Sequence, residues 1–185
     1  MRAEAAFMEQ SRAYLTGEYL PKIRECCARL SAEQLWWRPN EASNSVANLV
    51  LHLAGNVRQW IVAGVGGAAD ERRRQEELDA RGGLGADELL ARLEAAVAEA
   101  DAVLAGLDPA HMAEPARIQG RDVTVQSAIY HVVEHFAGHT YQIAYITKML
   151  TAADLGFYAL EGGIPRPTWG REPAQIRRIS SRPSL

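Results

Sequence analysis

The stretch from Val125 to Thr151, VQSAIYHVVEHFAGHTYQIAYITKMLT, decides how this chain folds. Its apolar side chains recur every three or four residues, which is the period of an α-helix with one buried face. Thr124 stands just before the stretch and can cap it, because its hydroxyl can accept a hydrogen bond from a free backbone N–H of the first turn. We therefore predict one long amphipathic helix. Its apolar face consists of Val125, Ala128, Ile129, Val132, Phe136, Ile143, Ile146 and Leu150.

Three other segments have the same helical period. The first runs from about Glu4 to Leu30, and Pro21 inside it is expected to kink or split the helix. The second starts after three possible caps at residues 43–45 and ends at the glycines of residues 64–67. The third spans about residues 86–107 and stops at Asp108-Pro109. Four one-sided helices without a convincing sheet predict an all-α fold, a four-helix bundle.

The segments between and after these helices are polar. Residues 70–81 are a run of charges, which we interpret as a solvated connector rather than a short exposed helix, so the second and third helices have a long connection. Residues 118–123, centred on Gln119-Gly120, predict a small hairpin. After Glu161 the chain is rich in Gly, Pro, Arg and Ser. We therefore predict a helical domain over residues 1–160 and an extended or partly disordered tail over 161–185.

The composition argues against several kinds of partner. A chain of 185 residues can bury one core of its own. Its net charge of −3 gives no reason to expect nucleic acid or an anionic membrane surface. No stretch is apolar and long enough to span a bilayer, and the N-terminus lacks the apolar core of a signal peptide. Cys26 and Cys27 are adjacent, which suits no ordinary structural disulfide and favours a reducing, cytoplasmic compartment.

Three histidines follow one another at intervals of four residues on the last predicted helix: His131, His135 and His139. Each step of four moves about 6 Å along the helix axis, so neighbours can share a metal ion. The outer two are about 12 Å apart and cannot easily do so. The metal pair is therefore His131 with His135, or His135 with His139. The second pair lies closer to the apolar face, which favours it.

A further histidine, His52, lies at the margin of the apolar face of the second helix. Packing of the two helices could bring this margin to His135 and His139, which would give three imidazoles, the ligand number of an open catalytic zinc site. Imidazole nitrogens bind Zn, Ni, Fe or Cu, and ligand type alone does not select among them. Zn or Ni is the ion that we expect. Asn48, Asn56 and Gln59 lie near the same helix face and could orient a ligand or a bound water.

An overlapping motif suggests different chemistry. Residues 131–135, HVVEH, match the H-x-x-E-H pattern of inverted zincins, in which Glu134 would be the general base. Such a peptidase needs an acidic ligand on another helix. The downstream candidates are Glu161 and Glu172, and both lie in the predicted tail. We therefore interpret Glu134 as an exposed helical residue.

Two segments resemble the signature segments of the DinB superfamily: Ser45 to Leu53, SVANLVLHL, and His135 to Gln142, HFAGHTYQ. Within the superfamily, three stretches resemble a bacterial branch described as a domain of unknown function. They are residues 35–40 (LWWRPN), 49–67 (LVLHLAGNVRQWIVAGVGG) and 131–148. The likeness extends over most of residues 1–150. Tyr141 stands where the superfamily pattern has glycine, a departure that leaves the histidines intact.

The resemblance implies a four-helix bundle, usually a homodimer, with one divalent metal held by His52, His135 and His139. Gln142 matches a recurrent glutamine one turn after the last histidine, and His131 is either a pocket residue, a spare ligand or plain surface. Characterised relatives include thiol-dependent S-transferases and isomerases that use bacillithiol, mycothiol or glutathione.

The function expected from this resemblance is the metal-dependent transfer of a low-molecular-weight thiol to a small electrophile. The metal would hold the thiol as its nucleophilic thiolate. Two alternatives stay open at this point. One is a metal-dependent hydrolase with Glu134 or another carboxylate as its base, and the other is a stress protein that binds metal without catalysis.

Overall fold

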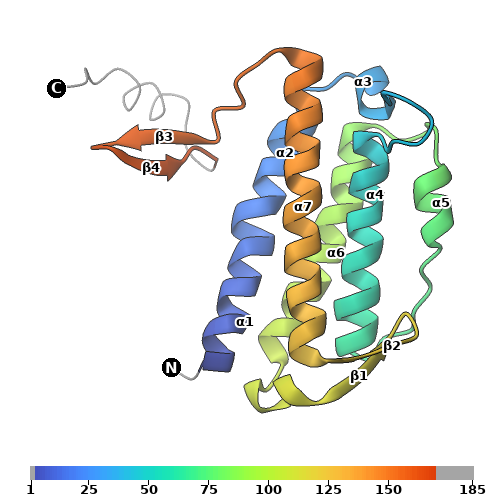
Figure 1. Ribbon diagram of the computed structural model, residues 1–185, viewed down its shortest axis with the longest axis vertical. Helices are drawn as coiled ribbons and strands as arrows, with labels where there is room; N and C mark the ends of the chain where they lie inside the picture. Colours follow the sequence, from blue (N-terminus) through green and yellow to red (C-terminus); the bar gives the residue numbers. More distant parts are fainter. Residues whose placement is uncertain (1–2, 170–185) are drawn as a thin grey trace.

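The structure is a computed structural model that describes residues 3–169, and its long helices run side by side around one core (Figure 1). This arrangement confirms the predicted all-α bundle. The long helical segments are α1 (Ala3–Ala13) with η1 (Tyr14–Tyr19) and α2 (Leu20–Cys27), α4 (Val46–Val57) with η2 (Arg58–Val65), α6 (Ala86–Gly106), and α7 (Val125–Thr151). The short ones are α3 (Ala32–Trp36), α5 (Arg74–Asp79) and η3 (Pro109–Ala113). Within residues 3–169, no helix has the length and apolar character needed to cross a bilayer.

Helix α7 has the limits that the sequence predicts. The Thr124 side chain accepts a hydrogen bond from the backbone N–H of Ser127, and Ala152 ends the helix in the left-handed conformation, with φ of 52°. Its buried face includes Ile129, Phe136 and Ile143 and packs against α2, α4 and η2. Because α7 is one continuous helix of 27 residues, burial of its apolar face also determines the direction in which the histidines on its α4 side point.

Helix α4 lies between α6, α7 and α5 and is buried on most sides. It begins with a capping box, in which the Ser45 hydroxyl accepts from the backbone N–H of Asn48 and the Asn48 side chain accepts from the N–H of Ser45. Such a cap fixes where the helix starts. His52 therefore occupies a defined depth in the bundle, where it is buried.

The first helical rod continues through Pro21 instead of breaking there. The six residues before α2 form the π-helical segment η1, and Pro21 stands in the first turn of α2. A π-turn displaces the backbone hydrogen bonds by one residue. The proline, which has no N–H to donate, thus follows a segment where the α-helical ladder is already interrupted.

The connector between η2 and α6 (residues 66–85) differs from expectation. The interpretation of residues 70–81 as a solvated connector is wrong, because residues 74–79 form α5, which lies along α4 (Figure 1). The side chains of Arg72 and Glu77 are only 4% and 13% exposed. They form an ion pair with one another, which compensates for part of the cost of removing both charges from water.

Two hairpins complete the chain as described. Strands β1 (Pro115–Ile118) and β2 (Arg121–Thr124) pair antiparallel, as the sequence predicts, with Gln119 and Gly120 at the turn. Both turn residues have positive φ, 53° and 74°, as a type I′ turn requires. Strands β3 (Tyr158–Glu161) and β4 (Ile164–Pro167) form the second hairpin, so the domain boundary expected at residue 160 falls inside a strand. Residues 170–185 of the predicted tail lie outside the described residues.

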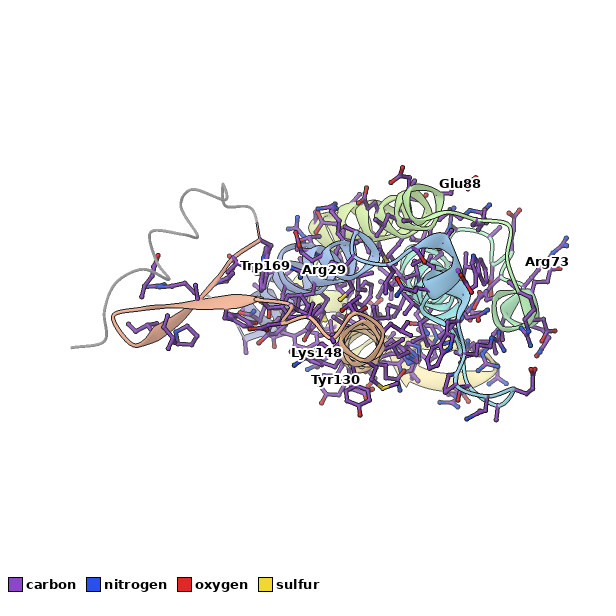
Figure 2. All side chains as sticks on the ribbon, turned by 90° about the horizontal axis from the view of Figure 1, so that it is seen from above. Arg29, Arg73, Glu88, Tyr130, Lys148 and Trp169 are labelled. Atoms are coloured by element: carbon purple, nitrogen blue, oxygen red, sulfur yellow. The ribbon has the colours of Figure 1, made fainter. Side chains whose placement is uncertain are left out.

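Hairpin β3–β4 projects beside the bundle, and a buried lysine of α2 joins it to the helices (Figure 1). Lys22 is 1% exposed and donates hydrogen bonds to Glu18 and to the hydroxyl of Tyr158. Its ammonium lies 5.0 to 5.7 Å from the centroids of four rings, those of Tyr141, Phe157, Tyr158 and Trp169. Figure 2 shows Trp169 where the hairpin meets the helices.

Burial alone would lower the pKa of Lys22, but its hydrogen bonds to Glu18 and Tyr158 outweigh this effect and raise the pKa above its usual range. The ammonium therefore stays charged in the interior.

Candidate metal centre

Three histidines from two helices meet between α4 and α7. His52 comes from α4, and His135 and His139 come from successive turns of α7. One ring nitrogen of each lies within 4.8 Å of the corresponding nitrogens of the other two. The Nε2 atoms of His52 and His135 are 3.0 Å apart. The ring centroids of His135 and His139 are separated by 4.4 Å, and those of His52 and His139 by 5.3 Å.

These distances fit a small divalent ion. Zn–N bonds of about 2.0–2.1 Å in a tetrahedral site place two nitrogens about 3.3 Å apart. The nitrogen separations in this cluster, from 3.0 Å to at most 4.8 Å, bracket that value. The largest of these separations exceeds that value by at most about 1.5 Å, so small side-chain rotations can bring all three nitrogens into one coordination sphere. Three protein nitrogens leave at least one position for a water or a substrate atom.

Each of two ligands has a hydrogen-bond partner behind it. Nδ1 of His139 lies 2.7 Å from the side-chain oxygen of Gln142, which can only accept, so Nδ1 carries the proton and the lone pair of the ring is left on Nε2. Nδ1 of His52 lies 3.1 Å from Oε2 of Glu77. Metal-bound histidines commonly donate their second nitrogen to such acceptors, which fixes the ring orientation.

The surroundings of His135 and His139 favour their neutral imidazole forms. Burial, together with the charges that His139 and His52 would carry, lowers the pKa of His135 to about 3. Burial also lowers the pKa of His139 and outweighs the opposing hydrogen bond to Gln142. A neutral imidazole has a free lone pair, so no proton has to be displaced from these two side chains at neutral pH before a metal binds.

Glu77 is ionised in the same surroundings. Burial by itself would raise the pKa of its carboxyl group, but hydrogen bonds from Arg72 and His52 outweigh burial and hold the pKa below its usual range. The negative charge next to His52 is thus permanent at neutral pH, and Arg72 balances it.

The structure places the other predicted pocket residues at varying distances from the cluster. His131 lies against Trp60, with ring centroids 4.2 Å apart, and its ring is 5.4 Å from that of His135. Asn56 is buried, and its side-chain oxygen has no hydrogen-bond partner among residues 3–169. Gln59 bonds to Asp70 and Arg72.

Asn48 does not contact a histidine ring in any hydrogen bond of the described chain. Its amide instead donates to the backbone carbonyls of Glu77 and Ala80, and its oxygen accepts from Arg38. Asn48 therefore fastens the connector that carries Glu77 to the start of α4.

Sequence reasoning missed Arg72 and Glu77. Both lie in a charge run with no apolar period, and such runs are usually solvated. One signal was present. Gly55 lies inside a helix of mostly apolar residues, and a glycine inside a helix costs about 1 kcal/mol relative to alanine. Its presence indicates that another group approaches the helix backbone there.

A cleft opens on the outer side of the Arg72–Glu77 pair. Its volume is about 330 Å³, and residues of α4, η2 and the connector line it, among them Gly55, Arg58 and Gln59. The polar lining and the size, at the small end of ligand pockets, suit a small polar molecule.

Comparison with known proteins identifies the family of this chain. A family model described as Mycothiol-S-transferase matches residues 12–151, a stretch that contains all three clustered histidines. None of the curated proteins compared with the chain matches it. The matched family is part of the DinB superfamily, so the resemblance seen in the sequence is confirmed. Because the match covers well over half of its 185 residues, the chain belongs to the mycothiol-S-transferase family.

Proposed function

We propose that this protein transfers a low-molecular-weight thiol, with mycothiol as the first candidate, to a small electrophile in a metal-dependent reaction. The observation that carries the proposal is the cluster of three imidazoles inside the segment that matches the family. His52, His135 and His139 would hold the ion, with Zn or Ni as the expected metals. When bound, the metal supplies positive charge that favours the thiolate form of the thiol.

The protein's own residues account for the remaining requirements. Gln142 and Glu77 hold the rings of His139 and His52 so that one nitrogen of each faces the cluster. The indole of Trp60 covers His131 beside His135 and gives that side of the site an apolar wall. In the transfer, a C–S bond forms to an electrophilic carbon while the bond from that carbon to the departing group breaks. The departing group leaves with the electron pair of the broken bond, and the thiol proton passes to solvent or to that group.

Turnover should require both the metal and the thiol. The purified protein would be stripped with a chelator, reloaded with Zn²⁺ or Ni²⁺, and assayed with mycothiol, bacillithiol and glutathione against a chromogenic aryl halide. We expect a rate above the background reaction only in the reloaded protein, and the highest rate with mycothiol. Equal rates in stripped and reloaded protein would refute the proposal.

Hydrolysis has weaker support. Its candidate base, Glu134, is exposed on α7 and is not one of the residues whose ligand atoms gather at the cluster. Glu134→Gln in the same assay separates the two chemistries, because thiol transfer should survive the substitution and Glu134-dependent hydrolysis should not. A stress protein that binds metal without catalysis would be stabilised by the ion and show no turnover.

We also propose that the protein is a cytoplasmic homodimer. Both cysteines are free and buried, as a reducing compartment would leave them. The outer face of α7 carries large apolar side chains that remain accessible, and Figure 2 shows Tyr130 directed away from the bundle. Tyr141, Tyr145 and Met149 are 55%, 67% and 50% exposed and follow one another at intervals of four residues. A second copy could cover this strip.

A charge placed in this strip should separate the two copies. For Tyr145→Glu we expect a change from dimer to monomer in light scattering coupled to size-exclusion chromatography, because the carboxylate would lose its water in the interface. Arg92→Glu, at an exposed position on α6, is the matched control and should stay dimeric. A dimeric Tyr145→Glu protein would place the interface elsewhere, and a monomeric wild type would contradict the homodimer.

A further inference from the structure

Gly55 of α4 lies beneath the carboxylate of Glu77. A methyl group at this position would collide with Oε1 of Glu77, and it would come within 2.8 Å of the carboxyl carbon and 2.9 Å of Nε of Arg72. Only a residue without a side chain therefore lets the ion pair settle against the helix. Since glycine weakens a helix, the close approach gives Gly55 a reason to be there.

In the space left by Gly55, which we call the notch, Arg72 binds the carboxylate of Glu77 with two parallel hydrogen bonds. Its Nε donates to Oε1 over 2.8 Å, and its Nη2 donates to Oε2 over 2.8 Å. Paired contacts of this kind fix the plane of the carboxylate as well as its position. The other end of the guanidinium is also held, because Nη1 donates to Gln59.

The hydrogen atoms in this network determine the tautomer of His52. Nη2 of Arg72 has two hydrogens, one directed to Glu77 and the other to the backbone carbonyl of His52, 3.3 Å away. The second hydrogen also meets Nδ1 of His52, 3.1 Å from Nη2, so the contact with Arg72 is compatible with either tautomer and the ionised carboxylate of Glu77 decides between them. Nδ1 can satisfy the nearby Oε2 of Glu77 only by donating, so it carries the proton and Nε2 presents a lone pair toward His135.

We propose that Glu77, Arg72 and Gly55 form one positioning unit that holds His52 in the tautomer and orientation needed to bind the metal. The connector thereby becomes part of the metal centre, although no hydrogen bond within residues 3–169 joins it to His135 or His139. The proposal rests on the metal centre of the proposed function but not on thiol transfer. Partners of this kind behind a ligand typically change metal affinity 10- to 100-fold.

The test measures Zn²⁺ affinity by competition with a chromophoric chelator in the absence of any thiol. Glu77→Gln removes the charge, and Gly55→Ala keeps every charge but pushes the carboxylate out of its notch. We expect each single variant to bind Zn²⁺ about 10- to 100-fold more weakly than the wild type. The double variant should bind Zn²⁺ only slightly more weakly than the single variant with the lower affinity, because both substitutions disrupt the same unit. Glu76→Gln, whose side chain is 70% exposed, and Gly17→Ala, where a methyl group meets nothing within 4 Å, are the matched controls.

A second readout follows the tautomer itself. In metal-stripped wild-type protein, ¹⁵N shifts of the His52 ring should report a proton on Nδ1, and both variants should lose this preference while circular dichroism stays unchanged. Wild-type Zn²⁺ affinity in both variants would overturn the proposal, as would an Nε2-protonated His52 in the wild type. A wild type that binds no metal would refute the metal centre as well, whereas failure of thiol transfer alone would leave this proposal standing.

Discussion

Replacing His135 by alanine is expected to abolish stoichiometric metal binding. His135 is the central ligand of the cluster, since its ring lies 5.1 Å from that of His52 and 4.4 Å from that of His139. Each protein ligand of a zinc site supplies about 3 kcal/mol of binding free energy, so the affinity should fall by at least about 100-fold. Metal content of the untagged protein, measured by mass spectrometry, gives the result and names the ion.

His111→Ala is the matched control for this loss. His111 lies in η3, its side chain is 50% exposed, and its ring contacts only Glu114 among the ion pairs of residues 3–169. This variant should retain the full metal content. Equal metal in wild type and His135→Ala would place the ion elsewhere, and no metal in either after loading with Zn²⁺ and Ni²⁺ would remove the basis of the proposed catalysis.

The second large effect is expected at Lys22. Lys22→Met leaves the carboxylate of Glu18 in a half-buried position with only Tyr158 as its donor, and removes the cation from among four rings. Removing one member of a buried ion pair typically costs about 3–5 kcal/mol, and we expect a loss of about 3 kcal/mol in the free energy of unfolding. Urea denaturation followed by circular dichroism measures this loss.

Two further variants show whether the cause is the stranded charge. Glu18→Gln combined with Lys22→Met removes both charges and should be more stable than Lys22→Met alone. Arg24→Met breaks the ion pair with Glu94, whose two side chains are 52% and 40% exposed, and should cost less than about 1 kcal/mol. If Arg24→Met were as destabilising as Lys22→Met, burial of the ammonium would not be what matters.

Local signals explain why much of the bundle could be predicted from the sequence. Helix α7 starts after a threonine cap and has an unbroken apolar face, so both its limits and its buried side follow from short-range rules. The β1–β2 hairpin follows from Gln119-Gly120, where two positive φ angles are needed. The π-helical segments η1 and η2 could not be predicted, because they have the same residue types as the α-helices that they continue.

The residues of the candidate site also fall into two groups, those that local sequence patterns predict and those that depend on contacts between distant segments. A spacing of four residues places His135 and His139 on one side of α7, and the margin of the apolar face directs His52 toward them. Arg72 and Glu77 depend on where a polar connector folds back over α4, 20 and 25 residues after His52. No local period specifies that contact. Lys22 is similar, because its burial depends on ring contacts from Tyr158 and Trp169 at the other end of the chain.

The notch at Gly55 also restricts how this sequence can change during evolution. A chain that exchanged Gly55 for a larger residue could not keep a carboxylate in the place that Glu77 occupies, because the two groups claim the same space. The opposite order of substitutions is allowed, in which the carboxylate at position 77 is lost first. A lineage without this carboxylate no longer needs the glycine at position 55 and gains helix stability from alanine. Positions 55 and 77 should therefore vary together in descendants of this sequence, with the change at position 77 coming first.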